Sequence, residues 1–251
     1  MVDALFPTAV PADASWHRYT TARQSPGDNG TTVVYGTELP TETELKLLGT
    51  VEGSRILDLG CGTGRNAVAL ARQGAKVLAV DPSTELLALA RDRADAADVR
   101  VELHQAGLAE LAFLRSDSID AAVSVMALAS ADDLARVFRQ VHRVLKPEAP
   151  LVCSVPHPAF AMIDPTAPDP LRIVRAYDDS STRTWELDGR DVTDFPRTFA
   201  DLFTTFSRAN FRIDHVIEPT ASGPSGRDPG YADVMRTVPA TLLLRARKQG
   251  N

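Results

Sequence analysis

The sequence predicts an α/β fold organised around a doubly wound parallel sheet. An apolar run at Ile56–Leu59 has the pattern of a strand buried on both faces. The run breaks into glycines at alternate positions, which are Gly60, Gly62 and Gly64. A helical pattern follows as far as Gly74, and a second strand, Val77–Val80, ends at Asp81. A strand, a glycine turn, a helix and a strand with a terminal acid make half of a nucleotide-binding unit, with its ligand at the carboxyl ends of the strands.

Length and composition limit the classes of protein that fit. The 251 residues, 44% of them hydrophobic, suit one α/β domain with a modest insertion. The formal net charge of −6 argues against a nucleic-acid partner, which usually requires a basic face. Cys61 and Cys153 are the only cysteines, and they predict small buried residues in a reducing compartment. No apolar run approaches a membrane span and the first residues lack the features of a signal peptide, so we expect a cytoplasmic protein without a membrane partner, as a monomer or homodimer.

The glycines fit two registers. Gly62, Gly64 and Ala67, with Asp81 further on, fit the dinucleotide fingerprint G-x-G-x-x-G/A. The full string Asp58-Leu-Gly-Cys-Gly-Thr-Gly64 instead resembles motif I of the class I S-adenosylmethionine-dependent methyltransferases, in their small-molecule branch. An acid at the strand end would repel a pyrophosphate, whereas S-adenosylmethionine has no phosphate and carries a sulfonium and an ammonium group.

The resemblance implies a Rossmann-like, three-layer αβα fold. Its seven-stranded sheet would be mostly parallel with an antiparallel last strand, and it would carry a small insertion after strand five. The resemblance covers residues 40–156 well and 195–247 loosely. We therefore expect an N-terminal arm or lid at 1–39, a methyltransferase domain at 40–251, and a substrate-covering insertion at 157–194 within it.

The remaining elements follow from periodicity and turn signals. Thr41 and Glu44 form a capping box for a helix that we expect to end at Gly49. Asp188-Gly189 between alternating arms predicts a hairpin. The other expected strands are 99–103, 118–126, 151–155, 211–217 and 241–244, and the other expected helices are 83–93, 134–145 and 198–210.

By the resemblance, the cofactor would lie against the glycine turn and the ends of the neighbouring strands. Asp81 would accept hydrogen bonds from both ribose hydroxyls, and Asp58 would steer the cationic amino-acid end. The glycines would keep side chains away from the ligand. Where the family usually has an acid for the adenine amino group, this chain has Gly107, so main-chain groups or Glu110 would supply that contact. The candidate cofactor-binding residues are Asp58, Gly60, Cys61, Gly62, Gly64, Asp81, Pro82, Gly107, Leu108 and Met126, of which Met126 fits a core position equally well.

Two histidines are candidate bases. His157 lies just past the fifth strand, on the expected pocket side, and His17 lies on the expected lid. The plainer interpretation of His157 is a loop histidine hydrogen-bonded to the insertion. The candidate substrate contacts are Trp16, Tyr19, Trp185 and Arg197, although Arg197 fits a structural ion pair at a helix end as well. No Cys/His cluster has metal-ligand spacing, so no metal is expected.

These observations predict an S-adenosylmethionine-dependent methyltransferase that acts on an O or N atom of a small organic molecule, with carbon left open. Two alternatives stay open at this stage. One is an NAD(P)-dependent oxidoreductase that uses the Gly62, Gly64 and Ala67 register. The other is a non-catalytic scaffold that binds the cofactor.

Overall fold

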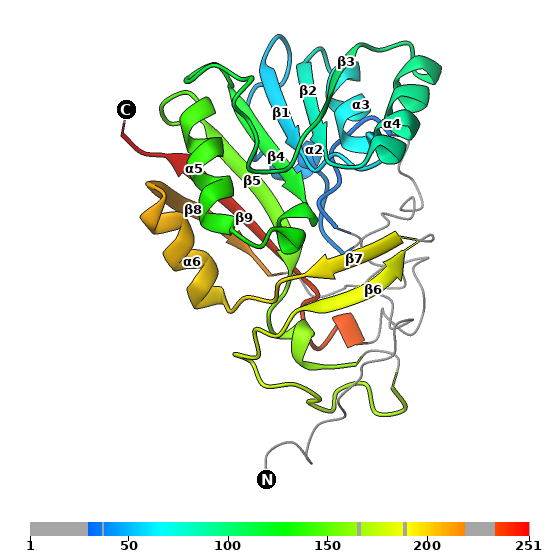
Figure 1. Cartoon of the computed structure of the whole chain (residues 1–251), viewed down its shortest axis with the longest axis vertical. Coiled ribbons are helices and arrows are strands. Elements are labelled where there is room, and N and C mark those ends of the chain that lie inside the picture. The colour runs from blue at the N-terminus through cyan, green and yellow to red at the C-terminus, as the bar shows by residue number, and fades with distance from the viewer. Residues whose placement is uncertain (1–29, 37, 165–166, 188–189, 219–233, 251) are drawn as a thin grey trace.

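A single mixed sheet forms the centre of the molecule (Figure 1). The computed structural model describes residues 30–36, 38–164, 167–187, 190–218 and 234–250, without the side chains of 185–187 and 190–192. The seven strands follow the order β3-β2-β1-β4-β5-β9-β8. Their bounds are β1 Arg55–Leu59, β2 Lys76–Asp81, β3 Val101–Gln105, β4 Ala121–Val125, β5 Pro150–Pro156, β8 Phe211–Ile217 and β9 Thr241–Lys248.

Strand directions confirm the predicted topology. The pairs β1–β2, β2–β3, β1–β4 and β4–β5 are all parallel, while β9 runs antiparallel to both β5 and β8. The order reverses between β1 and β4, because β2 lies on one side of β1 and β4 on the other. At such a reversal the crossover helices leave on opposite faces, which opens a crevice at the carboxyl ends of the strands.

Helices cover both faces of the sheet, as the predicted three-layer arrangement requires (Figure 1). Leu57 and Leu59 of β1 pack into one core cluster with α5 and α6, whereas Ile56 packs into the other with α3. This alternation follows from the two-residue period of a strand. The described helices are α2 Glu42–Leu45, α3 Arg65–Arg72, α4 Thr84–Ala96, α5 Leu134–Val144 and α6 Phe199–Arg208, with 3₁₀ turns η1 Ala127–Ser130 and η2 Phe160–Met162.

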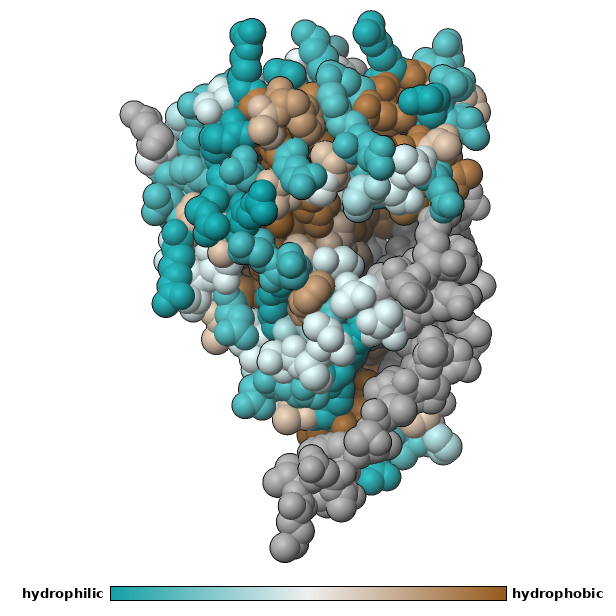
Figure 2. Space-filling model, viewed as in Figure 1, coloured by the Kyte–Doolittle hydropathy of each residue, from teal (hydrophilic) through white to brown (hydrophobic). Residues whose placement is uncertain are grey.

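Helices α5 and α6 pack on each other as well as on the sheet. Phe138 of α5 stacks on Phe206 of α6 with ring centroids 4.1 Å apart, and both side chains are fully buried. Phe211, the first residue of β8, packs edge-on against both rings. The outer surfaces of these two helices carry mainly hydrophilic side chains (Figure 2), so each helix is amphipathic as its sequence pattern predicts.

The helix expected to run from Thr41 to Gly49 is shorter than predicted. Its capping box is formed, but α2 ends at Leu45 because Lys46 adopts a left-handed conformation with φ of 51°. The buried Glu42 carboxylate then accepts hydrogen bonds from the main-chain N–H groups of Leu47 and Leu48. A buried side chain has therefore replaced the next helical turn as the partner of these N–H groups.

Two strands also differ from their expected bounds. The third strand is Val101–Gln105 rather than 99–103, and the fourth is Ala121–Val125 rather than 118–126. Ile119 makes only an isolated bridge, to Leu145. Met126 leaves the fourth strand with a φ of 62°. Hydrogen bonding to the neighbouring strands decides where each strand begins and ends, and the alternation of apolar and polar residues does not reveal that pairing.

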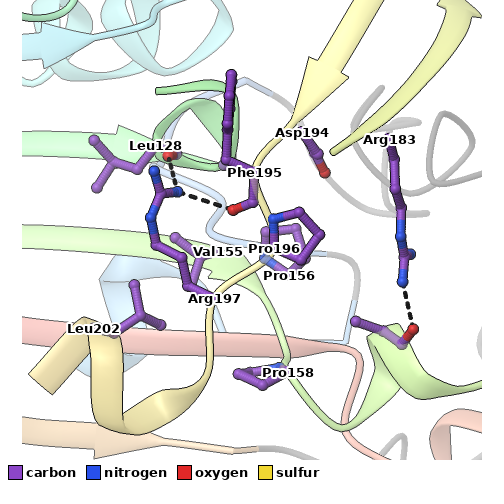
Figure 3. Close-up of a pocket in the computed structure, with 12 residues that line it drawn as sticks. Leu128, Val155, Pro156, Pro158, Arg183, Asp194, Phe195, Pro196, Arg197 and Leu202 are labelled. Atoms are coloured by element: carbon purple, nitrogen blue, oxygen red, sulfur yellow. Dashed lines mark hydrogen bonds between the residues drawn. The ribbon is translucent and has the colours of Figure 1, made fainter. Parts of the chain in front are cut away.

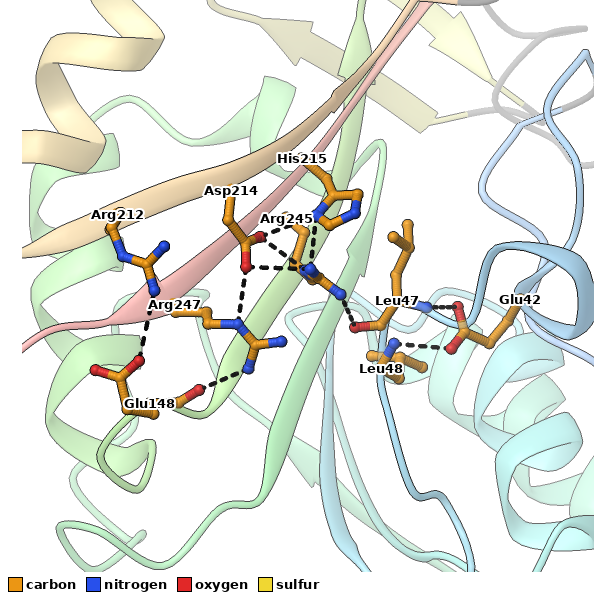
Figure 4. A network of polar contacts seen from close by, with 9 residues as sticks. All are labelled: Glu42, Leu47, Leu48, Glu148, Arg212, Asp214, His215, Arg245 and Arg247. Atoms are coloured by element: carbon orange, nitrogen blue, oxygen red, sulfur yellow. Dashed lines mark hydrogen bonds and ion pairs between the residues drawn. The ribbon is translucent and has the colours of Figure 1, made fainter.

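A polar network holds the antiparallel edge of the sheet (Figure 4). Asp214 of β8 accepts hydrogen bonds from Arg245 at 2.7 Å and Arg247 at 2.8 Å, both on β9. Burial works against ionisation here, yet the two guanidinium groups lower the pKa of Asp214 to about 2. This charge-assisted cluster complements the backbone pairing of β8 with β9.

The predicted hairpin is present in the insertion. Its arms are β6 Arg183–Leu187 and β7 Arg190–Asp194, paired antiparallel, while Asp188 and Gly189 lie outside the described residues. After β7, the main-chain N–H of Phe195 donates to the carbonyl of Ala129 at 2.9 Å. This bond attaches the end of the insertion to η1, at the carboxyl end of β4.

Candidate functional site

The loop after β1 is attached to the end of β2. The main-chain N–H groups of Gly60 and Cys61 donate to the carbonyl of Val80. Asp81, which is 6% exposed, accepts from the N–H of Gly62 at 2.9 Å and from the N–H of Ser83 at 3.0 Å. Each carboxylate oxygen can accept more than one hydrogen bond, so Asp81 supports the loop and keeps acceptor capacity for a vicinal diol.

The glycines of this loop have different spatial roles. A Cβ on Gly60 would lie 2.1 Å from the Cβ of Ala127, so Gly60 allows η1 to approach the loop. A Cβ on Gly64 would meet Ala90 of α4 at 2.7 Å. Only a Cβ on Gly62 would enter open space. At Gly60 and Gly64 the missing side chain therefore makes room for Ala127 and Ala90, which the prediction did not foresee. At Gly62 the close approach of a ligand stays a prediction.

Asp58 contributes a buried carboxylate with an unsatisfied oxygen. Its side chain is 2% exposed, and the main-chain N–H of Ala67 donates to it at the start of α3. The other oxygen, Oδ2, is buried with no hydrogen-bond partner among the described residues. Burial raises the pKa of Asp58 to about 7, and the nearby Asp81 carboxylate adds to the rise. A cationic ligand group, such as the ammonium end of S-adenosylmethionine, would donate a hydrogen bond to this oxygen and so satisfy it.

The thiol of Cys61 lies in the same electronegative environment. Burial raises its pKa, and Asp58 and Asp81 raise it further. A thiol held protonated in this way is a poor nucleophile. The observed contribution of Cys61 to the loop is the hydrogen bond from its main-chain N–H to Val80.

The segment after β3 lies beside the same loop. Ala106 donates its N–H to the carbonyl of Asp81 at 3.3 Å, and the Leu108 side chain lies 3.5 Å from where a Cβ of Gly60 would be. The N–H of Gly107 donates to Glu110 Oε2 at 3.1 Å. Pro82 is exposed next to Asp81. Pro82, Gly107 and Leu108 thus lie next to residues that contact the loop, and an adenine contact through main-chain groups or Glu110 stays a prediction.

The side chain of Met126 points into a core cluster. It is 7% exposed and packs with Phe160, Val234 and Met235. Its main-chain N–H donates to the carbonyl of Ser154 at 2.8 Å. A left-handed backbone conformation is rare for a residue with a long side chain, and it marks a constrained position at the end of β4. The core interpretation fits its side chain, and a cofactor contact through its main chain stays a prediction.

A hollow lies on the other side of η1 (Figure 3). Ala127 packs on the glycine loop, while the next residues, Leu128 and Ala129, line the hollow. The empty space inside it, including open solvent at its mouth, is about 460 Å³. The other residues of its wall are Val155, Pro156, Pro158, Ala161, Arg183, Asp194, Phe195, Pro196, Arg197 and Leu202.

Arg197 lines the hollow, but its guanidinium is bonded to main chain (Figure 3). It donates to the carbonyls of Leu128 and Phe195, and also to those of Ala131 and Asp132. Arg197 therefore holds η1 and the segment after β7 together. A substrate contact for Arg197 stays a prediction, because these hydrogen bonds use both terminal nitrogens of the guanidinium.

His157 is also bonded to the protein. Its Nδ1 accepts from the N–H of Ala159 at 3.0 Å, and its Nε2 lies 3.1 Å from Glu218 Oε1. This pattern assigns the proton of a neutral ring to Nε2. Pro156 and Pro158 line the hollow and His157 does not. Its predicted role as a base is untested, and the geometry favours the plainer interpretation of a histidine held by neighbouring segments.

The remaining predicted contacts fall outside what the structure describes. Trp16, His17 and Tyr19 belong to the undescribed segment 1–29. Trp185 lies in β6, where its side chain is not described. Among the described residues, no group of three or more His, Cys, Asp or Glu could hold a metal ion. None of the helices in the described part of the chain is long and apolar enough to cross a membrane.

Sequence reasoning missed two charged residues in the wall of the hollow, Arg183 and Asp194. They are register partners at the open end of the hairpin. A two-residue turn at Asp188-Gly189 pairs positions whose numbers sum to 377, so counting outward from the turn would have placed them opposite each other. Their position against η1 comes only from the fold.

Comparisons with known proteins agree with this geometry. Residues 56–148 match the family of methyltransferase domains. The structure of an S-adenosylmethionine-dependent methyltransferase from Mesorhizobium loti is 27% identical and superposes with a TM-score of 0.61, covering 82% of this chain and 96% of that one. A protein from Listeria monocytogenes gives a TM-score of 0.70 at 28% identity, covering 83% and 96% of the two chains.

Several curated relatives are O-methyltransferases. Magnesium-protoporphyrin O-methyltransferase of Rhodobacter capsulatus is 34% identical over 155 residues, which cover 60% of this chain and 67% of that protein. Ubiquinone biosynthesis O-methyltransferase of Xanthomonas oryzae pv. oryzae is 34% identical over 102 residues, which cover 41% and 43%. Apart from the Rhodobacter protein, the chain spans about half the length of the curated relatives it matches here.

Proposed function

The chain belongs to the class I S-adenosylmethionine-dependent methyltransferase family, and we propose that it methylates an O or N atom, with carbon left open, of a small organic molecule bound in the hollow beside η1. Its cofactor is S-adenosylmethionine. The oxidoreductase alternative is set aside because the chain belongs to the methyltransferase family. The buried pair Asp58 and Asp81 supports this choice, since two carboxylates would repel a pyrophosphate.

The chain's own residues would hold the cofactor as follows. Gly62, next to open space, would pass its main chain under the cofactor, with Gly60 and Gly64 closing the turn against Ala127 and Ala90. Asp81 would accept hydrogen bonds from the ribose hydroxyls. Asp58 would face the cationic amino-acid end with its unsatisfied Oδ2.

Once bound, the cofactor supplies a methyl group already activated by a positively charged sulfur. The remaining tasks of the protein are to position the acceptor, exclude water and accept a proton where the acceptor must lose one. The wall of the hollow suits the first two tasks, because most of its residues are apolar and several are prolines. Pro158, Ala161, Arg183 and Asp194 belong to the insertion 157–194, which supports its proposed role in covering the substrate.

One observation carries the proposal. A single 3₁₀ turn, η1, packs against the cofactor loop through Ala127 and lines the hollow through Leu128 and Ala129. This arrangement supports the proposal, because the two proposed sites would be separated by one turn of chain, as direct transfer between two bound molecules requires.

The experiment pairs cofactor binding with turnover. We expect S-adenosylhomocysteine to raise the melting temperature, with a stabilisation of about 2.7 kcal/mol at a hundred times its Kd, and NAD and NADP to leave it unchanged. We expect release of S-adenosylhomocysteine from S-adenosylmethionine only when a suitable small hydroxyl or amino compound is added. Stabilisation by the dinucleotides alone would reject the proposal. Cofactor binding without turnover on any member of a broad acceptor panel would favour the non-catalytic scaffold.

A further inference from the structure

Two opposite charges in the wall of the hollow do not pair with each other. Arg183 and Asp194 are direct register partners across β6 and β7, a position where opposite charges normally interact. Instead, Arg183 Nη2 donates to the carbonyl of Ala161, and Asp194 Oδ1 accepts one long hydrogen bond, of 3.4 Å, from Ser130. Figure 3 shows both side chains projecting beside the hollow.

Each of these two groups has unused hydrogen-bonding capacity. Arg183 Nε is buried and has no hydrogen-bond partner among the described residues. Asp194 is 9% exposed, and within the described part of the chain Ser130 is the only hydrogen-bond donor to its carboxylate. Buried polar groups in native proteins are nearly always satisfied, so an orphaned guanidinium nitrogen and a weakly bonded carboxylate in the wall of one hollow fit a site for a polar ligand group.

The electrostatics of the pair agree with this geometry. Burial raises the pKa of Asp194 to about 6, against the opposing effects of Arg183, Ser130 and Arg197, which are the polar and charged groups that face it. Burial also lowers the pKa of Arg183 to about 10, with Arg175 contributing. Asp194 is thus ionised at neutral pH but holds a proton more readily than an ordinary carboxylate, as a general base must.

We propose that Arg183 and Asp194 bind the hydroxyl group of the acceptor, with Asp194 as the general base and Arg183 as the donor that stabilises the oxygen as it becomes negative. This inference rests on the proposed function. The acceptor class is a small apolar molecule with an ionisable hydroxyl, such as a phenol or an enol. Phe195, Leu202 and the three prolines of the wall would contact its apolar part.

The positive charge of Arg183 selects oxygen over nitrogen. A hydroxyl that loses its proton develops negative charge beside the guanidinium, which is favourable. An amine that attacks a methyl group develops positive charge there, which is unfavourable. A carboxylate acceptor would need no base and would meet the Asp194 carboxylate with repulsion.

In the step that this pair serves, the O–H bond of the acceptor breaks and its proton passes to Asp194. The oxygen electron pair forms the new C–O bond to the methyl carbon. The bond between that carbon and the cofactor sulfur breaks, and its electron pair stays on sulfur. The products are the methyl ether, S-adenosylhomocysteine and a protonated Asp194, which later releases its proton to solvent.

The test measures binding of 4-nitrophenol to the protein saturated with S-adenosylhomocysteine, because the visible absorbance of this probe reports its ionisation. Nitrobenzene and 4-nitroaniline are the matched probes. We expect 4-nitrophenol to bind at least about tenfold more tightly than either, the lower end for hydrogen bonds to charged groups. We expect Arg183→Met to raise the pKa of the bound probe and Asp194→Asn to lower it, since one variant removes a positive charge and the other a negative one.

The controls are Arg172→Met and Asp178→Asn, which change exposed residues of the same insertion. Both should leave the affinity and pKa of the probe unchanged. Equal binding of the three probes, no binding of any of them, or shifts in the same direction in both variants would overturn the inference. Calorimetry with S-adenosylhomocysteine on each protein distinguishes failure of the proposed function from failure of the inference. If the wild type does not bind S-adenosylhomocysteine, the proposed function has failed. If it binds normally while the probes give one of the contrary results, only the inference has failed.

Discussion

Replacing Asp58 by Asn should stabilise the cofactor-free protein and weaken its cofactor binding at the same time. The wild-type carboxyl has a pKa of about 7 in the folded protein, against an ordinary value of 3.8. Between these values the folded carboxyl keeps its proton while the unfolded one loses it. The contribution of Asp58 to the unfolding free energy is therefore largest below about pH 4 and falls as the pH rises to about 7.

This difference corresponds to about 4 kcal/mol at pH 8, at about 1.4 kcal/mol for each tenfold change in proton affinity. An asparagine carries no charge, but it places an NH₂ where the orphaned Oδ2 lies, and that group would also be unsatisfied. We therefore expect a net gain of about 2–3 kcal/mol at pH 8, or roughly 4–12 °C in melting temperature, and a loss of about 1–2 kcal/mol near pH 4, where only the cost of the unsatisfied amide remains. The assay is chemical and thermal unfolding from pH 4 to pH 8.5.

Cofactor binding should change in the opposite direction. The uncharged amide of the Asp58→Asn variant cannot form an ion pair with the cationic end, so affinity for S-adenosylmethionine should fall by about 1.5–3 kcal/mol. In the wild type, binding a cation should lower the pKa of Asp58 and release a proton near pH 7, which calorimetry in buffers of different ionisation enthalpy detects. The Asp58→Asn variant should release none.

Asp120→Asn is the sign control for this experiment. Burial opposes ionisation of Asp120, yet its hydrogen bonds with Lys146 and the Arg55 N–H lower its pKa. The same substitution should therefore destabilise the protein at pH 8. An Asp58→Asn variant that is less stable than wild type at pH 8, or that binds S-adenosylmethionine equally well, would refute the reasoning about Asp58.

Three further predictions concern the loop, the sheet edge and η1. Asp81→Ala should weaken binding of S-adenosylhomocysteine by about 1.5–3 kcal/mol, measured by calorimetry, and unchanged affinity would contradict its ribose role. Gly60→Ala should cost about 2–4 kcal/mol of unfolding free energy, because the new Cβ would clash with Ala127 and the left-handed backbone would be strained. Gly62→Ala should cost only the backbone strain, about 1–2 kcal/mol. Equal costs in denaturant melts would show that η1 moves aside without cost. Arg197→Met should lower stability by about 2–4 kcal/mol because four carbonyls lose a donor, against less than about 0.5 kcal/mol for the exposed Arg172→Met; a similar small effect for both would mean that η1 is held by other contacts.

Local sequence patterns predict much of the fold. The glycine string between two apolar strands, the capping box at Thr41 and the Asp188-Gly189 turn each depend on residues close in sequence, and the elements beside them are where they were predicted. The misplaced ends lie where a distant group decides. Glu42 ends α2 by accepting from the turn beyond it, and strand pairing shortens the fourth strand.

The proposed cofactor site could be inferred from the sequence because motif I is contiguous and its chemistry follows from a few residue types. Asp58, Asp81 and the glycines converge there by strand order alone. The proposed acceptor site could not be predicted in this way. Its polar residues come from a hairpin whose packing on η1 depends on Arg197, Phe195 and Ala129, which are far apart in the chain.

The printed chain alone therefore determines the layered α/β architecture, the glycine loop proposed to bind the cofactor and the strand ends next to it, since these depend on periodicity, glycine geometry and local hydrogen bonds. Tertiary packing alone decides which glycine faces open space, that Asp58 keeps an unsatisfied oxygen, and that Arg183 and Asp194 line a hollow without pairing. The physical reason is that burial and unmet hydrogen bonds are properties of the surroundings of a side chain, and those surroundings are assembled from segments with no sequence relation to it.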